Sequence, residues 1–219
     1  MELIEKIKIW LATPDLTELE KAIKTVQALT LEAMVLMKSN PALNSELGPL
    51  LGKLKGQSKR FSEIEKVDWV NIQEGKLALG HRPSTKLVQD LKLQGTCHIF
   101  SLLSESEEAK KIKTLAEKSG MNWIWFPMTS AQAPKETRAD ELKEVFQLIS
   151  SVLKSHGKIY IHCSAGIHRT GMITYSLLRY LGYSEKETES LLTQLRTETA
   201  KGVGEHRKLW AEELLRILT

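Results

Sequence analysis

Hydrophobic residues at the start of the chain recur with a helical period. Leu3, Ile7 and Leu11 fall at four-residue intervals, and apolar residues from Leu19 to Leu31 continue in steps of two to four. The helical spacing extends as far as Leu54. The Ser-Asn-Pro sequence at residues 39–41 interrupts this pattern, as expected where a helix ends. We therefore expect two or three helices in this part of the chain.

Residues 52–59 contain Gly52, Gly56 and Ser58 among lysines, a composition that predicts a linker. We expect this linker to join a helical extension, residues 1–60, to a larger domain, residues 61–219. Charge does not mark the boundary, because basic and acidic residues are nearly balanced on both sides of it.

From about residue 67, short apolar runs alternate with amphipathic segments. Strands are expected at residues 76–79, 97–103, 122–126 and 158–162, where β-branched and aromatic residues gather. Strands separated by helices predict an α/β domain, with a central, mostly parallel sheet flanked by helices. The helices are expected at residues 85–93, 106–118, 139–154, 170–181, 185–196 and 205–218.

The run His-Cys-Ser-Ala-Gly-Ile-His-Arg-Thr-Gly at residues 162–171 joins the last predicted strand to a helix. Five residues between Cys163 and Arg169 allow a loop whose backbone N–H groups point inward at phosphate oxygens, and Gly166 permits its tight backbone. Arg169 can add a permanently charged fork. The helix N-terminus and Arg169 both favour a thiolate at Cys163, which is a nucleophile suited to phosphoryl transfer.

This run resembles the signature His-Cys-x5-Arg-Ser/Thr of the cysteine-dependent protein tyrosine and dual-specificity phosphatases. The order of elements over roughly the last 150 residues is also similar to the small dual-specificity type. The resemblance implies a phosphatase that hydrolyses phosphomonoesters of a protein or small molecule through a phosphocysteine intermediate. It implies no cofactor and no metal, and it leaves the N-terminal helices unexplained.

The resemblance also implies a role for each residue of the run. Cys163 would attack phosphorus, Arg169 would hold the phosphoryl oxygens, Thr170 would help the sulfur leave, and His162 would support the loop. For His168, substrate contact and a surface position that caps the loop are both open. The phosphate-binding residues implied are Ser164, Ala165, Gly166, Ile167, His168 and Arg169.

One feature of the resembled family is missing. Its members carry an Asp general acid in the loop after the third strand, but residues 126–134 contain no carboxylate, and Ser130 falls near the expected position. The nearest acids are Glu136 and Asp140. Either could be a displaced general acid, or Asp140 could instead complement the dipole of the following helix.

Several functions therefore remain open. The chain could be a slow phosphatase, a phosphatase for substrates with good leaving groups, or a phosphate-binding module with little turnover. A fourth reading is a phosphatase for non-protein substrates such as inositol phosphates, inositol pyrophosphates or nucleotides.

Composition limits the kinds of partner and the cellular compartment that are expected. The formal net charge is +4, from 31 Lys+Arg and 27 Asp+Glu, which is too small to indicate nucleic acid. No run of 18 apolar residues predicts a membrane span, and the charged first residues do not resemble a signal peptide. Two cysteines favour a reducing compartment, so a cytoplasmic protein is expected.

Three further features have more than one interpretation. Cys97 is either a small core residue or a resolving thiol for Cys163. Arg82, His206 and Arg207 either flank the phosphate pocket or lie in turns and caps. The N-terminal helices could pack on the larger domain, dimerise, or dock a partner.

Overall fold

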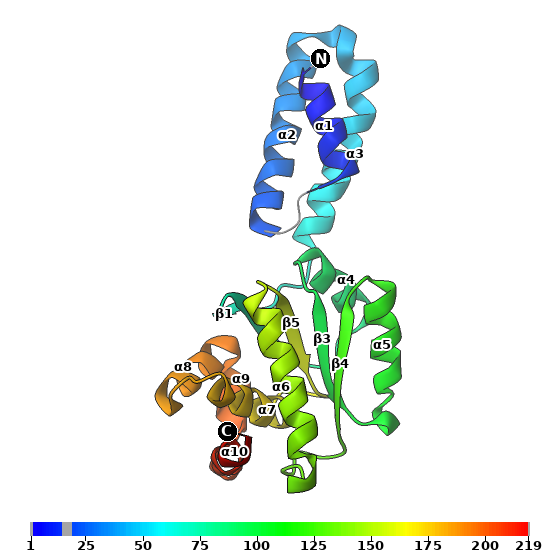
Figure 1. The fold of residues 1–219 in the computed structure, drawn as a ribbon. Coiled ribbons are helices and arrows are strands. Elements are labelled where there is room, and N and C mark those ends of the chain that lie inside the picture. The colour runs from blue at the N-terminus through cyan, green and yellow to red at the C-terminus, as the bar shows by residue number, and fades with distance from the viewer. Residues whose placement is uncertain (1, 15–18, 219) are drawn as a thin grey trace. The chain divides into compact units, whose positions relative to one another are not determined.

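The computed structural model describes residues 2–14 and 19–218 (Figure 1). The chain forms two compact units. One is built from residues up to Glu65 together with Leu93–Gly95, and the other from Lys66–Lys92 and the residues from Thr96 onward. The predicted boundary at residue 60 stays a prediction. Within the described ranges, no helix is long and apolar enough to span a bilayer.

The first unit consists of helices, as its hydrophobic period predicted. The helices are α1 (Glu2–Ala12), α2 (Leu19–Ser39) and α3 (Asn44–Ser62), with a 3-10 turn, η1 (Pro41–Leu43), after α2. Apolar side chains of all three helices form one buried cluster. Its buried members are Ile4, Ile7, Ala22, Val26, Leu29, Ala33, Leu47, Leu54, Phe61 and Ile64.

The predicted linker at residues 52–59 is wrong, because these residues lie inside α3. Leu47, Leu54 and Phe61 recur every seven residues and are at most 4% exposed. Burying each such side chain stabilises by about 1.5–3 kcal/mol, whereas each glycine in a helix costs about 1 kcal/mol. Packing against α2 therefore outweighs the poor helix propensity of the glycines.

The second unit contains a five-stranded sheet in the order β1-β2-β5-β3-β4. β1 pairs antiparallel with β2, and the other three pairs are parallel, which confirms the predicted mostly parallel sheet. β1 was not expected, because its three residues are too few to show a period. The strands are β1 (Val70–Ile72), β2 (Gly75–Gly80), β3 (His98–Leu103), β4 (Asn122–Met128) and β5 (Lys158–His162).

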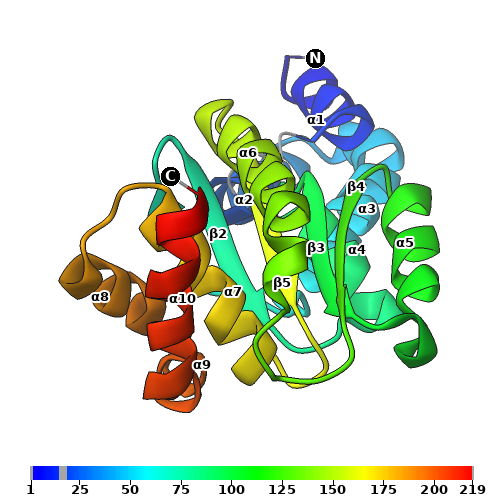
Figure 2. The same cartoon turned by 60° about the horizontal axis from the view of Figure 1, so that its bottom comes forward.

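Helices cover both faces of this sheet (Figure 2). α4 (Thr85–Leu93) and α5 (Ala109–Lys118) pack on one face. α6 (Ala139–Lys154) and α7 (His168–Tyr180) lie on the other. Beyond α7 the chain continues through α8 (Glu185–Leu195), the short α9 (Thr197–Gly202) and α10 (Glu205–Leu218).

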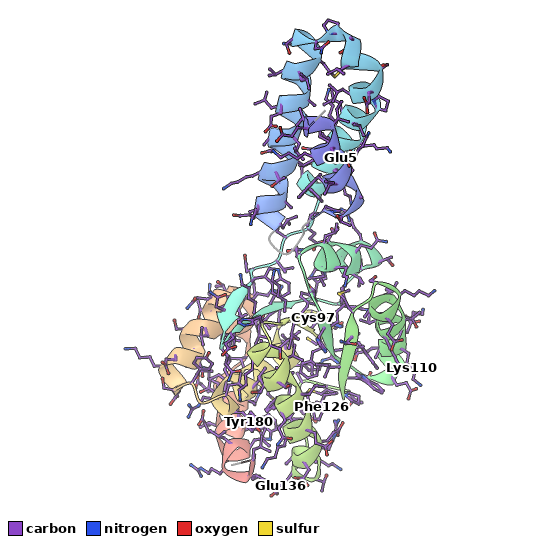
Figure 3. The ribbon with its side chains drawn as sticks, turned by 45° about the horizontal axis from the view of Figure 1, so that its top comes forward. Glu5, Cys97, Lys110, Phe126, Glu136 and Tyr180 are labelled. Atoms are coloured by element: carbon purple, nitrogen blue, oxygen red, sulfur yellow. The ribbon has the colours of Figure 1, made fainter. Side chains whose placement is uncertain are left out.

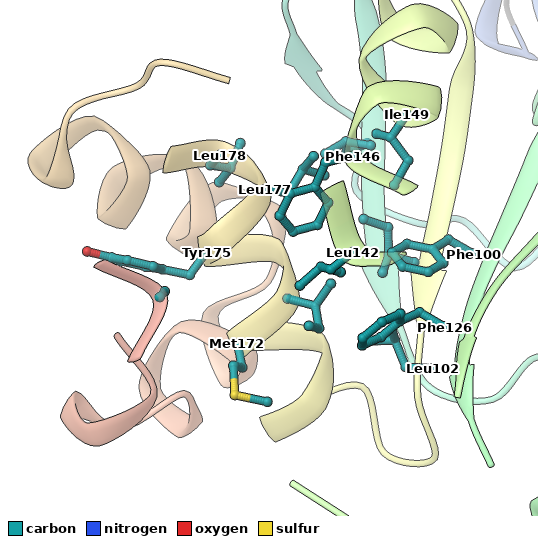
Figure 4. Packing of buried hydrophobic residues seen from close by; sticks show 14 of the residues in the cluster. Phe100, Leu102, Phe126, Leu142, Phe146, Ile149, Met172, Tyr175, Leu177 and Leu178 are labelled. Atoms are coloured by element: carbon teal, nitrogen blue, oxygen red, sulfur yellow. The ribbon is translucent and has the colours of Figure 1, made fainter. Parts of the chain in front are cut away.

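Alternation along the strands separates two clusters of buried side chains. On β5, Ile159 and Ile161 belong to the cluster on the α6 face, and Tyr160 belongs to the cluster on the α4 face. Phe146 of α6 lies between the sheet, at Phe100, and α7 (Figure 4). This packing fixes β5 and α7 on either side of the loop that connects them.

The helix predicted at residues 106–118 begins later than expected. A 3-10 turn, η2 (Glu105–Glu107), precedes it, and Glu108 has a positive φ of 61°. Ser104 and Glu107 form a capping box at this turn. The turn places Glu107 at the carboxyl edge of the sheet, just after β3.

Candidate active site

The loop of residues 163–167 connects the carboxyl end of β5 to the N-terminus of α7. Gly166 has a φ of +72°, which strains residues that carry a Cβ. A Cβ at Gly166 would lie 2.2 Å from the carbonyl oxygen of Gly80 and 2.4 Å from Nη1 of Arg196. Only glycine therefore fits this position.

Donors from outside the loop hold its carbonyl groups. The Gly166 carbonyl accepts hydrogen bonds from Thr199 Oγ1 (2.6 Å) and Arg196 Nη1 (2.9 Å). The same Arg196 nitrogen donates to the Ala165 carbonyl at 2.9 Å. The Ser164 carbonyl accepts a hydrogen bond from the Arg82 backbone amide at 3.0 Å. Contacts from outside therefore hold three carbonyls of the loop, and in a loop held this way amide N–H groups can face an anion on the opposite side.

Cys163 lies at the base of this loop and is only 3% exposed. The Gly166 amide donates to its sulfur at 3.2 Å. Burial, the largest single influence, raises the pKa of the thiol. Hydrogen bonds from Thr170 and Gly166 and the charge of Arg169 together outweigh burial, so the pKa of Cys163 lies below its ordinary value.

His162 and Thr170 support the loop from behind. His162 is fully buried, and burial lowers its pKa to about 4, so the ring is neutral at pH 7. Its Nδ1 lies 3.1 Å from the carbonyl oxygen of Cys163, so the proton belongs on Nδ1. The buried Thr170 hydroxyl has no oxygen or nitrogen partner within the described residues, and its interaction with Cys163 lowers the pKa of that thiol.

Arg169 is held by a residue that the sequence analysis did not identify. Its Nη1 and Nη2 donate to the two carboxylate oxygens of Glu107, at 2.6 and 2.8 Å. Nη1 also donates to the Met128 carbonyl at 2.8 Å. The Arg169 hydrogen bonds lower the pKa of Glu107 to about 2. The Ser-x-x-Glu spacing from Ser104 could have predicted a helix cap here, but not an arginine partner 62 residues away.

A cavity of about 250 Å³ opens above Cys163. One wall is the signature loop, and the opposite wall comes from the segment after β4. Four of the six predicted phosphate-binding residues line it, while Gly166 and Ile167 lie in the loop backbone outside the lining. The lining residues are Ser130, Ala131, Cys163, Ser164, Ala165, His168 and Arg169.

Glu136 and Asp140 are not among the residues that line this cavity. Glu136 lies in a 3-10 turn, η3 (Glu136–Arg138), at the end of the unit opposite Cys97 (Figure 3). It lines a different cavity of about 270 Å³, together with Trp210 of α10. A general-acid role for either carboxylate stays a prediction that the geometry does not favour.

Cys97 lies at the far end of the sheet from Cys163. Its amide donates to the carbonyl of Lys158, the first residue of β5, whereas Cys163 follows the last residue of that strand. Five strand residues span roughly 16 Å, more than twice the Cα separation of about 7 Å that a disulfide tolerates. The resolving-thiol interpretation of Cys97 is therefore wrong.

Of the remaining sequence candidates, Arg82 and Arg207 contact segments of the site without lining the cavity, and His206 does not line it either. The Arg82 guanidinium pairs with Glu108 at 3.4 Å, and Arg207 Nε donates to the Ala131 carbonyl at 2.8 Å. Across the described part of the chain, no three His, Cys, Asp or Glu side chains are grouped to hold a metal ion.

Comparisons with known proteins agree with this geometry. Residues 79–213 match the sequence family described as dual specificity phosphatase, catalytic domain. A search of curated protein sequences finds no match.

Solved structures of phosphatases have a similar fold. Kinase associated phosphatase, with its catalytic-site cysteine replaced by serine, is 21% identical, with a TM-score of 0.54 over 68% of this chain and 91% of that chain. Tk-PTP in its active form is 22% identical, with a TM-score of 0.53 over 69% and 95%. PTPMT1 in complex with PI(5)P is 14% identical, with a TM-score of 0.51 over 69% and 99%.

Proposed function

We propose that this chain, which belongs to the dual specificity phosphatase family, hydrolyses phosphomonoesters through a phosphocysteine formed on Cys163. The observation that carries the proposal is the position of Cys163, whose thiol pKa is lowered, at the base of a cavity that Arg169 also lines. A thiolate facing a bound phosphoryl group is a nucleophile in the required place.

Phosphate binding rests on the loop and on Arg169. The contacts of Arg169 to Glu107 and Met128 occupy its Nη1 and one hydrogen of Nη2. The Nε–H and the second Nη2–H form the remaining edge of the guanidinium, a fork that matches two phosphoryl oxygens. We infer that this fork and the amides of Ser164 to Arg169 surround the phosphoryl group.

The reaction proceeds in two steps, formation and hydrolysis of the phosphocysteine. The Cys163 thiolate attacks phosphorus, and the bond to the ester oxygen breaks, so that the leaving oxygen departs with the electron pair. Water then attacks the phosphocysteine, which releases inorganic phosphate and restores the thiolate. In this second step the Thr170 hydroxyl stabilises the departing sulfur, and neutral His162 keeps the loop in position through the Cys163 carbonyl.

A second candidate function is a module that binds phosphorylated partners with little turnover. The observation that favours it is the lining of the cavity, which contains no carboxylate to donate a proton. Such a module would bind inorganic phosphate and would release none from an ester.

The proposal is tested by phosphate release from p-nitrophenyl phosphate, whose leaving group needs little protonation. We expect Cys163→Ser to lower kcat by about 10³-fold or more, since the nucleophile is lost. Cys97→Ser is the matched control, because Cys97 lies at the other end of the sheet, and it should retain activity. Wild-type activity no higher than that of Cys163→Ser, with binding of inorganic phosphate intact, would favour the binding module instead.

A further inference from the structure

The wall opposite the signature loop decides how the leaving group can depart. Ser130 and Ala131 line this wall. The Ser130 Oγ accepts a hydrogen bond from the backbone amide of Gln132 at 3.2 Å. Neither side chain is an acid at neutral pH, so this wall does not supply the proton that an aspartate supplies elsewhere in the family.

The other candidate carboxylates are either paired with an arginine or do not line the cavity. Glu107 binds Arg169 through both oxygens, and its pKa of about 2 keeps it ionised at neutral pH. Glu136 and Asp140 do not line the cavity. Among the described residues that line the cavity, His168 remains, but it is exposed to solvent at the first position of α7, directly after the loop that carries Cys163, and it does not belong to the wall with Ser130. We therefore do not assign it the proton.

Three arginines fix the segment that forms this wall. Arg169 donates to the Met128 carbonyl at 2.8 Å. Arg138 donates to the Pro127 carbonyl at 2.7 Å. Arg207 donates to the Ala131 carbonyl at 2.8 Å, and the Arg138 guanidinium lies 3.9 Å from the centre of the Phe126 ring. Contacts on both sides of Ser130 therefore hold it at the cavity.

We propose that this enzyme expels its leaving group without a proton from the protein, and so prefers phosphoryl groups on weakly basic oxygens, in aryl phosphates and phosphoanhydrides, over alkyl phosphates. This inference rests on the proposed function. It narrows the substrate to a chemical class that the arrangement of Cys163 and Arg169 does not specify.

The chemistry of the first step gives the reason. The leaving oxygen takes the electron pair of the P–O bond and departs as an anion, which gains a proton from water only afterwards. A tyrosine phenol has a pKa of about 10, and a phosphate leaving group has one of about 6. An aliphatic alcohol is close to water, at about 15.7, and is by far the poorest unassisted leaving group.

The experiment measures kcat/KM across aryl and alkyl phosphates of graded leaving-group pKa. We expect a steep decline with increasing pKa. Three further substrates distinguish an aryl phosphate, a phosphoanhydride and an alkyl phosphate. They are a phosphotyrosine peptide, a nucleoside diphosphate and a phosphoserine peptide. The kcat/KM of the phosphotyrosine peptide, of the nucleoside diphosphate or of both should exceed that of the phosphoserine peptide by at least about 10²-fold. This factor is the lower end of what a general acid contributes.

A gain-of-function variant provides the second arm. Ser130→Asp should place a carboxyl at the cavity, raise kcat on alkyl phosphates by about 10²-fold or more, and flatten the leaving-group dependence. Ser130→Asn is the matched control, since it has the same shape without an acid, and it should keep the steep dependence of the wild type.

A shallow dependence in the wild type would overturn the inference, because it would show that the protein already supplies a proton. If the dependence then became steep in His168→Asn, His168 would be the donor. A phosphoserine peptide hydrolysed as fast as the other two substrates would also overturn it. Failure of the proposed function gives a different result, in which Cys163→Ser matches the wild type on every substrate.

Discussion

Arg169 and Glu107 form the pair of residues on which we expect the proposed phosphate site to depend most. The Arg169 side chain is only 10% exposed and makes two hydrogen bonds to one carboxylate. A bidentate pair fixes the plane of the guanidinium, so the free edge of Arg169 points in one direction only. At this scale, we expect the strength of phosphate binding to depend on a carboxylate that does not itself line the cavity.

Substituting Glu107→Gln should therefore weaken the enzyme without removing any group that contacts substrate. Hydrogen bonds to charged groups contribute about 1.5–3 kcal/mol, so we expect kcat/KM for p-nitrophenyl phosphate to fall by about 10- to 100-fold. Glu105→Gln is the control, because Glu105 lies on the same turn and pairs only with the exposed Lys110. Equal losses in the two variants would contradict the assigned role of Glu107.

The same pair predicts a pH dependence of stability. The pKa of Glu107 is about 2 in the folded chain, below its ordinary value of 4.5. A depressed pKa adds stability above the ordinary value, and this contribution is lost as the pH falls toward 2. Urea unfolding at about pH 5 and about pH 3 should show a smaller loss in Glu107→Gln than in the wild type. An equal loss would mean that other carboxylates carry the effect.

At the scale of elements, the signature loop is shaped by the junction between α8 and α9. Arg196 and Thr199 bind its carbonyls from outside, and Gly166 lies too close to Arg196 and to the Gly80 backbone for any side chain. The loop conformation is therefore not a property of β5 and α7 alone. A segment about 30 residues further along the chain therefore helps to shape the proposed phosphate-binding loop.

Arg196→Ala should loosen the loop and raise the pKa of the Cys163 thiol, because the Gly166 amide would no longer be held against the sulfur. The pH profile of Cys163 alkylation by iodoacetate reports this shift, and kcat for p-nitrophenyl phosphate should fall by roughly tenfold or more. Glu198→Gln removes only an ion pair of Arg196 at 3.6 Å and should leave both readouts unchanged. An unshifted alkylation profile in Arg196→Ala would show that Arg196 does not position the loop.

At the scale of the whole molecule, the chain has separate hydrophobic cores. The helices of the first unit share one buried cluster, and the two faces of the sheet carry the other two. All the residues that line the cavity at Cys163 belong to the second unit. We propose that the two units are domains that divide near residue 60, and that the first contributes nothing to the chemistry.

Leu29→Ala tests this division on the full chain. Leu29 is 2% exposed, so its truncation should destabilise the first unit by about 2–5 kcal/mol. Leu31→Ala is the control on the same helix, because Leu31 is 64% exposed and its loss should cost little. Thermal unfolding by circular dichroism should show a lower first transition in Leu29→Ala, while hydrolysis of p-nitrophenyl phosphate is unchanged. A parallel loss of activity would mean that the units fold as one.

The sequence by itself determined the parts of this protein that depend on local patterns. The strand at residues 158–162 and the helices at residues 85–93, 139–154 and 205–218 were predicted with the bounds that the structure has. Their apolar residues keep one period over the whole element, and glycine or polar residues mark the ends. The loop from Cys163 to Arg169 was equally clear, because spacing, glycines and flanking elements all lie within ten residues.

Only the tertiary structure decided the features that depend on distant residues. The glycines of α3 indicated a linker until the burial of Leu54 and its neighbours was known. The contacts of Glu107 with Arg169 and of Arg196 with the loop left no signal in the sequence, because the partners lie 62 and about 30 residues away. A sequence period records which face of an element is buried, but not which side chain of another element meets it. That is why Cys163 could be proposed as the nucleophile from the sequence, while the groups that hold its loop and Arg169 could not be found there.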